Sequence, residues 1–325
     1  SFIGSGKLLV ECATHWRQQG GAIHSVIADC PIVSAWCVEN GIDRVVPGPD
    51  QITWLARAPF HYLFSIVNHA ITPASVLALP LKQAINFHDS PLPLYAGFNA
   101  TSWALIDGQA AHAITWHTMT ANVDGGAIIL QQAFDIRDDD TAFSLGVRCA
   151  EAGRLSFVQL VEMIALEASE GVTLPAVAQG LGHNFHGRAD RPGLGLIDFR
   201  QPTTQLQNFV RGLDLGSEDN WMCLPKLILP TGLFVVGDSV LAPGGGASGT
   251  ILAADAGSIT VAVADGALQF SRISTLEGEL VDVLSTGVRV GQFLTADAIP
   301  SSDIDALDPS FSKHERFWVR RLASL

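Results

Sequence analysis

Long apolar runs, paired cysteines and positive charge are what this sequence has least of. No stretch reaches the roughly 18 apolar residues of a transmembrane helix, and the N-terminus lacks the basic and apolar segments of a secretory signal, so no membrane association is predicted. The five cysteines are odd in number and form no CxxC pair, which argues against a disulfide framework and a cysteine-based metal site. We therefore expect buried, reduced thiols, no bound metal and a cytoplasmic location.

Basic residues are too few for a typical nucleic-acid-binding protein. The chain has 19 Lys and Arg against 32 Asp and Glu, a formal net charge of −13. Proteins that bind nucleic acids draw much of their affinity from neutralising phosphates. An acidic chain is repelled by phosphate backbones, so a nucleic-acid partner is not expected.

Hydrophobic residues, in contrast, make up 48% of the 325 residues, while charged residues make up 16%. That composition is typical of a packed globular protein, and the length suits two domains. In the first 140 or so residues, β-branched apolar segments alternate with segments of helical spacing. Such alternation predicts a doubly wound, mostly parallel, Rossmann-like α/β sheet. The expected strands are Phe2–Ile3, Ala22–Ala28, His61–Val67, Ala84–His88, His112–Thr118 and Ile128–Ile136, and the expected helices are Leu8–Trp16, Val33–Asn40, Pro73–Leu77 and Thr101–Ile106.

The pattern changes in the second half of the chain. A long helix is expected from Thr141, a suitable N-cap, to about Glu170, and a short one over Leu206–Leu213. Closely spaced short strands separated by glycine-rich turns follow, which predicts a small β-barrel of OB-like type. The predicted domains are a catalytic domain over 1–182, a linker over 183–203, the OB-like barrel over 204–300 and a tail or interdomain linker over 301–325. The expected strands of the barrel are Leu233–Val236, Gly249–Ala254, Ser258–Val263 and Ala267–Ile273.

Most of the chemical information lies between Asn86 and Gly126. Asn86 and His88 are two residues apart in a strand, so their side chains project from the same side, whereas Asp89 should point the other way. The carboxyl ends of strands are where open α/β sheets bind ligands. Asp124 follows later, in a loop with two glycines that let backbone approach a ligand closely.

An amide, an imidazole and a carboxylate together suit acyl transfer to an amine. A tetrahedral intermediate needs a hydrogen-bond donor for its oxyanion, which Asn86 can supply. His88 can manage protons near neutral pH, and Asp124 can orient the imidazole and move a proton. His117 could face the acceptor pocket, but a packing role is an equally good interpretation.

The motif N-x-H, followed by Ser90-Pro91-Leu92-Pro93 and the V-D-G-G segment around Asp124, resembles the 10-formyltetrahydrofolate-dependent formyltransferase family. The resemblance covers residues 1 to about 170, and more weakly the β-rich region. It implies that Asn86, His88 and Asp124 are catalytic and that 10-formyltetrahydrofolate is the co-substrate. The folate contacts it implies are Asn68, Ile71, Thr72, Ser90, Pro91, Leu92, Pro93, Asn122 and Val123.

The acceptor amine is less closely defined than the family. Many members carry an arginine after the S-x-L-P loop, where this chain has Ala96 to Ala100, and acidic residues outnumber basic ones over 188–325. Both features disfavour methionyl-tRNA as the acceptor of the formyl group. The N-A-T-S-W-A-L and I-T-W-H segments resemble formylation domains of peptide- or polyketide-synthesising megaenzymes, which implies an aminoacyl group on a carrier protein. The tail 314–322 resembles the linker into a following synthetase domain, although a terminal helix is an equally good interpretation. An amino-sugar nucleotide, water, and a non-catalytic folate-binding module remain alternatives.

Overall fold

The structure is a computed structural model that describes residues 1–180, 184–216, 220 and 222–294. It divides into two compact units, each described here by itself. Unit 1 comprises 1–100, 111–135 and 146–186, and unit 2 comprises 101–110, 136–145 and the chain from residue 187 onward. The predicted tail over 301–325, including the segment 314–322, lies outside the described residues.

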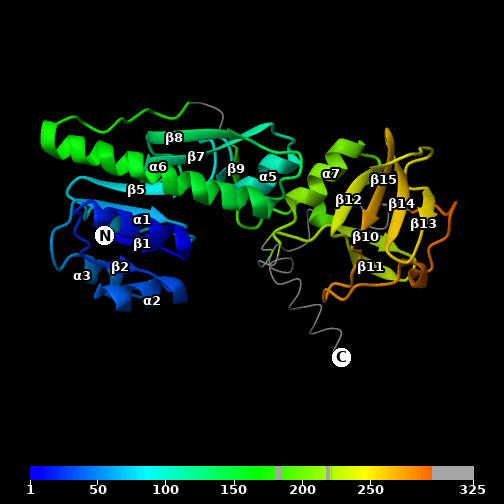
Figure 1. Ribbon diagram of the computed structural model, residues 1–325, viewed down its shortest axis with the longest axis horizontal. Coiled ribbons are helices and arrows are strands. Elements are labelled where there is room, and N and C mark those ends of the chain that lie inside the picture. Colours follow the sequence, from blue (N-terminus) through cyan, green and yellow to red (C-terminus); the bar gives the residue numbers. More distant parts are fainter. Residues whose placement is uncertain (181–183, 217–219, 221, 295–325) are drawn as a thin grey trace. The chain divides into compact units, whose positions relative to one another are not determined.

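Unit 1 is built on a seven-stranded sheet of order β3-β2-β1-β4-β5-β7-β8 (Figure 1). The first five strands in this order are parallel, while β7 runs antiparallel to β5 and β8 antiparallel to β7. The predicted doubly wound, mostly parallel sheet is confirmed. The elements of residues 1–186 are β1 (Phe2–Gly4), α1 (Gly6–Gln18), β2 (Val26–Ile27), α2 (Pro31–Asn40), β3 (Arg44–Val45), α3 (Gln51–Leu55), β4 (Tyr62–Ile66), α4 (Ala74–Leu77), β5 (Gln83–His88), β6 (Ala96–Gly97), α5 (Ala100–Ile106), β7 (Ala111–Thr118), β8 (Ile128–Asp135), α6 (Ala142–Glu170) and β9 (Phe185–His186).

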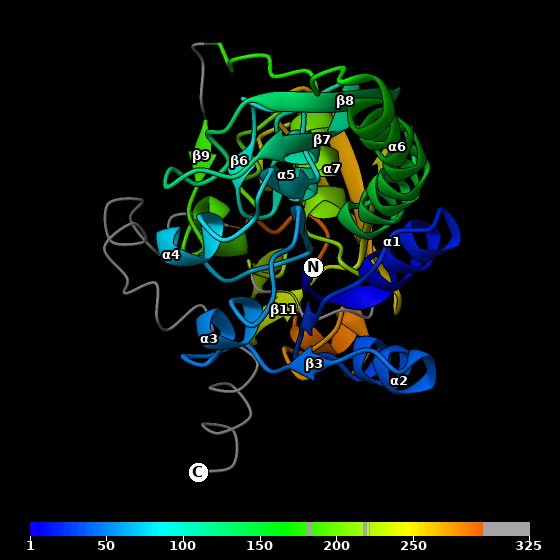
Figure 2. The same cartoon turned by 90° about the vertical axis from the view of Figure 1, so that its left-hand side faces the viewer.

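Alternation along the strands divides the core of unit 1 into two layers. On one face, Phe64 and Trp116 pack with apolar residues of α1, α2 and α6. On the other face, Leu63 and Ile3 pack with Leu55 of α3 and Val76 of α4. Figure 2 shows these two sets of helices on opposite sides of the sheet. Both faces are covered, as parallel sheets require, which explains why the strands read as continuous apolar runs.

Helix α6 contains two glycines in different surroundings, which permits a matched prediction. A Cβ at Gly146 would meet no atom within 4 Å, so Gly146→Ala should stabilise the fold by about 0.5–1 kcal/mol. A Cβ at Gly153 would lie 2.5 Å from the Phe87 ring, so Gly153→Ala should destabilise it by about 1–3 kcal/mol. Chemical denaturation of both variants measures the two effects. Equal changes in unfolding free energy would contradict the packing of α6 on β5.

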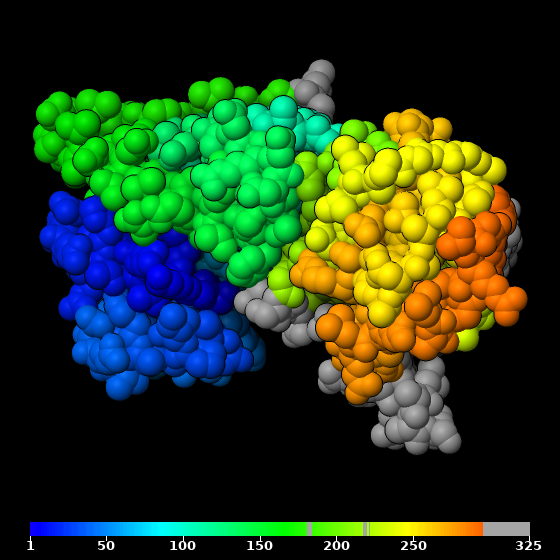
Figure 3. All heavy atoms as spheres, turned by 45° about the vertical axis from the view of Figure 1, so that its right-hand side comes forward, coloured from blue at the N-terminus to red at the C-terminus, as the bar shows by residue number. Residues whose placement is uncertain are grey.

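Unit 2 has a β-rich core of antiparallel strands. Atoms of this part of the chain are coloured yellow to orange in Figure 3. Four strands pair in the order β12-β15-β14-β13, and β10 pairs with β11. The predicted β-rich C-terminal domain is confirmed, whereas its closure as an OB-like barrel stays a prediction. The elements are η1 (Pro192–Gly195), α7 (Thr203–Gly212), β10 (Lys226–Leu229), β11 (Gly232–Val235), β12 (Asp238–Ala242), β13 (Ile251–Ala254), β14 (Ser258–Val263), β15 (Gly266–Ser271) and η2 (Val283–Thr286).

Several element predictions need correction. The expected strand Ala22–Ala28 is only two residues long, because β2 pairs just with the short strands β1 and β3. The predicted linker 183–203 contains β9, which pairs with β6, and the 3-10 helix η1. Strands β3, β6, β10 and β12 and helix α3 were not predicted, since each is too short or too polar to show a periodic pattern.

The domain boundaries stay a prediction, but the units differ from them in detail. Residues 101–110 and 136–145, which the sequence places in the catalytic domain, group with unit 2. Contacts within unit 2 give the reason. Arg211 of α7 donates hydrogen bonds to the carbonyl oxygens of Arg137, Asp138 and Asp140. Among the described residues, no helix combines the length and apolarity that a bilayer span requires.

Candidate active site

Strand β5 presents Asn86 and His88 at its carboxyl end. Phe87 between them packs into the layer formed with α1 and α6, so Asn86 and His88 project from the opposite face. The neighbour of β5 on one side is β4, which is parallel, and on the other side is β7, which is antiparallel. Asn86 and His88 therefore emerge where the strand direction in the sheet changes.

Asp124 reaches this strand end from the loop between β7 and β8. Its φ of 52° lies in the left-handed region, which aspartate tolerates better than most residues. The backbone amide of Gly97 donates a hydrogen bond of 2.9 Å to Asp124 Oδ2. The side-chain amide of Gln179 donates to the carbonyl oxygens of Asp124 and Gly126, at 2.6 and 2.7 Å. Two separate segments thus hold Asp124 in place, one at its carboxylate and the other at the backbone of its loop.

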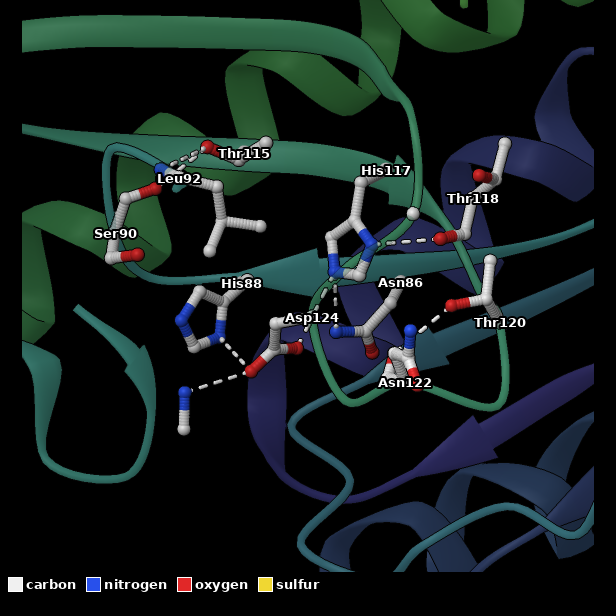
Figure 4. A network of polar contacts seen from close by, with 12 residues as sticks. Asn86, His88, Ser90, Leu92, Thr115, His117, Thr118, Thr120, Asn122 and Asp124 are labelled. Atoms are coloured by element: carbon white, nitrogen blue, oxygen red, sulfur yellow. Dashed lines mark hydrogen bonds and ion pairs between the residues drawn. The ribbon is translucent and has the colours of Figure 1, made fainter. Parts of the chain in front are cut away.

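The carboxylate lies between two histidines (Figure 4). Asp124 Oδ2 is 3.7 Å from Nδ1 of His88, and Asp124 Oδ1 is 3.5 Å from Nε2 of His117. On its other side, His88 Nε2 donates to the carbonyl oxygen of Tyr95 at 3.0 Å. Each ring nitrogen of His88 thus faces an oxygen atom, one of Asp124 and one of Tyr95. The structure therefore brings Asn86, His88 and Asp124 together, and their catalytic roles stay a prediction.

The site keeps Asp124 ionised despite its surroundings. Burial of the carboxyl group opposes ionisation, but the hydrogen bond with His117, the charge of His88 and the Gly97 amide outweigh it, so the pKa of Asp124 lies below its ordinary value. An ionised carboxylate beside an imidazole can hold that ring in orientation and accept a proton. These are the properties that the sequence predicted for this residue.

A pH dependence of stability follows from this lowered pKa. A carboxyl group with a lower pKa in the folded state stabilises the fold at pH values above its unfolded pKa of about 4, and this contribution disappears as the pH falls through the folded value. The stability of wild type relative to Asp124→Asn should therefore shrink between about pH 5 and pH 2. Urea denaturation of the wild-type protein and Asp124→Asn at several pH values across this range measures the difference in unfolding free energy. A constant difference would contradict the lowered pKa.

His117 is the residue of the site that the sequence left undecided. It pairs with Asn86 across β5 and β7, and its Nε2 lies 3.1 Å from Asn86 Nδ2. The apolar layer on the other face is occupied by Trp116, and the imidazole of His117 contacts Asn86 and Asp124. The structure therefore places His117 among the polar residues of the site, and its role stays a prediction. Its pairing position opposite Asn86 could have been deduced only after the strand order was known.

Two further contacts escaped the sequence analysis. Asp89 was expected to point away from His88, but its Oδ1 lies 3.9 Å from His88 Nδ1, because β5 ends at His88 and the strict alternation ends with it. Gln179, which holds the loop of Asp124, lies in a segment with no motif, so no sequence signal identified it.

The first group of predicted folate contacts follows the carboxyl end of β4. Asn68 Nδ2 donates to the hydroxyl of Thr72 at 3.2 Å, and Asn68 Oδ1 accepts from the backbone amide of Ala70. These bonds close a compact turn on which Ile71 is 80% exposed. The turn leaves a large apolar side chain in solvent next to a strand end.

The second group forms the loop after β5. Ser90 is fully buried and its hydroxyl donates to the carbonyl oxygen of Leu94, so this side chain supports the loop. Leu92 is buried, and the peptide bond from Leu92 to Pro93 is cis. Pro91 and Pro93 are half-buried. Ser90 and Leu92 thus shape the loop from within.

Asn122 and Val123 complete the predicted folate contacts, just before Asp124. The carbonyl oxygen of Asn122 accepts from the Thr120 hydroxyl and from the Gly125 amide. Val123 is 45% exposed. This loop, like the turn at Ile71, presents an apolar side chain to solvent, and no observation yet tests either as a folate contact.

Comparison with known families gives a match for each part of the chain. The family model of the formyl transferase domain matches residues 68–161, which include Asn86, His88 and Asp124. The family model of the formyl transferase C-terminal domain matches residues 191–286. Together the two matches cover more than half of the 325 residues, in the order of the family. The chain belongs to the formyl transferase family. The membership predicted from the sequence is confirmed.

Several proteins similar to this chain are named as N-formyltransferases, most of them acting on sugars. GDP-perosamine N-formyltransferase of Brucella melitensis is 32% identical over 151 residues, 46% of this chain. The chain spans 56% of the length of that relative. WlaRD, a sugar 3N-formyl transferase, has a TM-score of 0.64 with 16% identity over 84% of this chain and 96% of its own. An N-formyltransferase of Helicobacter canadensis gives the same TM-score and identity, covering 84% of this chain and 98% of its own. At such identities the two structures show a shared fold.

Proposed function

We propose that this protein transfers a formyl group from 10-formyltetrahydrofolate to a primary amine. The observation that carries the proposal is the meeting of Asn86, His88 and Asp124 at the carboxyl end of β5, within the residues that match the formyl transferase family model. The crystal structure of WlaRD was obtained with 5-N-formyl-tetrahydrofolate and that of the Helicobacter canadensis enzyme with folinic acid, which supports a folate donor.

The site accounts for the chemistry without a serine or cysteine nucleophile. The acceptor amine attacks the formyl carbon, and the bond to the folate nitrogen breaks after a tetrahedral intermediate. An N–H of Asn86 and protonated His88 stabilise the oxyanion. Asp124 keeps His88 oriented and helps to pass a proton from the amine to the leaving nitrogen.

Exposed apolar side chains near the strand ends fit an aromatic donor. Ile71, after β4, is 80% exposed, and Val123, before Asp124, is 45% exposed. Burial of such surface against a flat ring stabilises a complex by about 25 cal/mol per Å². The turn at Asn68 and Thr72 also offers backbone groups for polar contacts.

For the acceptor, we propose the amine of an amino-sugar nucleotide. Several of the relatives that match are named for amino-sugar substrates, such as GDP-perosamine, and the Helicobacter canadensis structure holds dTDP-3-aminofucose. The aminoacyl group on a carrier protein, which the sequence analysis favoured, finds no counterpart among them and is the second candidate, on the strength of the segment Asn99 to Leu105. Methionyl-tRNA is disfavoured by the net charge of −13.

The test supplies 10-formyltetrahydrofolate with three acceptors: GDP- or dTDP-linked amino sugars, aminoacyl carrier protein and methionyl-tRNA. Mass spectrometry of each acceptor detects a mass increase of one formyl group. Formylation of an amino sugar supports both the formyl transfer and the proposed acceptor. Formylation of a different acceptor alone supports the formyl transfer and replaces the amino-sugar nucleotide as its acceptor. Binding of the folate without formyl transfer to any acceptor would support a non-catalytic folate-binding module and overturn the proposal.

A further inference from the structure

Backbone groups at the short strand β6 contact both His88 and Asp124. The carbonyl oxygen of Tyr95, the residue before β6, lies 3.0 Å from His88 Nε2. The backbone amide of Gly97, within β6, donates a hydrogen bond of 2.9 Å to Asp124 Oδ2. Three consecutive residues thus touch two of the three predicted catalytic side chains. A shift of this backbone therefore changes the position of both side chains.

Strand β9 holds this backbone from a distant part of the chain. It pairs with β6 in parallel, and Figure 2 shows the two strands beside each other. The backbone amide of Ala96 donates to the carbonyl oxygen of Asn184 at 3.1 Å, and that of Phe98 donates to the carbonyl oxygen of His186 at 2.9 Å. A Cβ at Gly97 would lie 2.2 Å from the carbonyl oxygen of His186. The two strands therefore approach each other as closely as a glycine permits.

Asn184 adds a side-chain contact to this strand pairing. Its Oδ1 accepts a hydrogen bond from the backbone amide of Tyr95, 89 positions earlier in the chain. A backbone amide can only donate, so this partner fixes which end of the Asn184 amide faces it. Asn184 thus holds two successive residues, Tyr95 through its side chain and Ala96 through its carbonyl oxygen.

The conformation of Tyr95 explains why this residue has to be held. Its φ of 56° lies in the left-handed region, which is costly for a residue with a side chain. Such a conformation persists only where the surroundings impose it, and active sites are where it is commonly found. Without the bond from Asn184, the backbone of Tyr95 can relax, and its carbonyl oxygen then turns away from His88.

We propose that Asn184 is a positioning residue for the reaction, which acts through the backbone of residues 95–97 to set the places of His88 and Asp124. It forms no bond to the reacting atoms. A displacement of a reacting group by about 1 Å can lower a rate about 100-fold, so a contact outside the reacting centre can matter this much. Asn184 lies in the segment that the sequence predicted as a linker. This inference rests on the proposed formyl transfer.

The test compares two substitutions of Asn184. Asn184→Ala removes the acceptor, whereas Asn184→Asp keeps an oxygen in the same place to accept from the Tyr95 amide. We expect kcat to fall by about 30- to 100-fold in Asn184→Ala, with KM for donor and acceptor changed less than about threefold. Asn184→Asp should keep kcat within about fivefold of wild type, because the hydrogen bond remains. A wild-type kcat in Asn184→Ala, or equal losses in the two variants, would overturn the inference.

Phe185→Ala is the matched control in the same segment. The Phe185 side chain is 55% exposed, and its loss leaves the backbone pairing of β9 with β6 in place. We expect kcat of Phe185→Ala to stay within about threefold of wild type. A loss as large as that in Asn184→Ala would mean that any change in β9 disturbs the reaction, and would overturn the specific role of Asn184.

Amide hydrogen exchange followed by NMR gives a readout that does not depend on turnover. We expect the amides of Tyr95 and Gly97 to exchange at least about tenfold faster in Asn184→Ala than in wild type, while the amide of Ile85 in β5 keeps its rate. Faster exchange at Ile85 as well would mean that Asn184 holds the whole fold, and would overturn the inference. Unchanged exchange at Tyr95 and Gly97 would overturn it even if formyl transfer is confirmed. The expected exchange in a protein that formylates no acceptor would support the anchoring of β6 and refute the proposed function alone.

Discussion

Replacing Asp124 with asparagine is expected to lower kcat for formyl transfer by about 10²- to 10⁴-fold. The substitution preserves the shape of the side chain and can keep the hydrogen bond from Gly97, but it removes the negative charge that faces His88 and His117. Nδ1 of His88 then no longer faces a charged oxygen, and no carboxylate remains at this position to take up the proton of the amine. Rapid-quench or steady-state assays with the best acceptor measure the change.

Asp89→Asn is the matched control for this prediction. Its carboxylate also lies near His88, but the distance is 3.9 Å and the side chain is 43% exposed, against 9% for Asp124. Solvent screens the more exposed charge, so kcat should fall by less than about fivefold. A loss in Asp89→Asn as large as that in Asp124→Asn would show that general negative charge, and not the position of Asp124, matters to the reaction.

Gly126→Ala is expected to destabilise the fold by about 3 kcal/mol or more and to displace Asp124. A Cβ at Gly126 would lie 1.6 Å from the carbonyl oxygen of Thr118, a distance that neither atom can tolerate. The backbone must move at the point where Thr118 and Ala127 exchange hydrogen bonds. The loop carrying Asp124 would move with it, so stability and kcat should fall together.

Gly125→Ala provides the comparison for Gly126→Ala. A Cβ at Gly125 would meet Asn122 Cβ at 3.2 Å, a contact that a small shift of the exposed loop can relieve. Its effect on the unfolding free energy should stay within about 1 kcal/mol. Calorimetry and denaturant titration of both variants test the difference. Comparable stability of the two variants would contradict the close approach of the loop to β7.

The sequence predicted the larger elements of the fold because their patterns are long. Strands β4 and β5 and helix α6 were located within a few residues, since buried parallel strands are continuous apolar runs and α6 repeats its apolar residues over 29 positions. Strand β3 has two residues, and β12 is largely exposed, so neither had a pattern to detect. Pairing with distant strands, and not local preference, forms such elements.

For the site, the sequence by itself determined that Asn86 and His88 project together, because side chains two apart in a strand share a face. Composition and charge also determined the class of the chain, an acidic globular protein with a packed core. Only the tertiary structure decided the rest. The order of β5, β7 and β8 placed His117 opposite Asn86, and the bonds from Gly97 and Gln179 held Asp124 between two histidines. These contacts join residues up to 55 positions apart. Such distances are closed by sheet topology, which no local pattern of residues encodes.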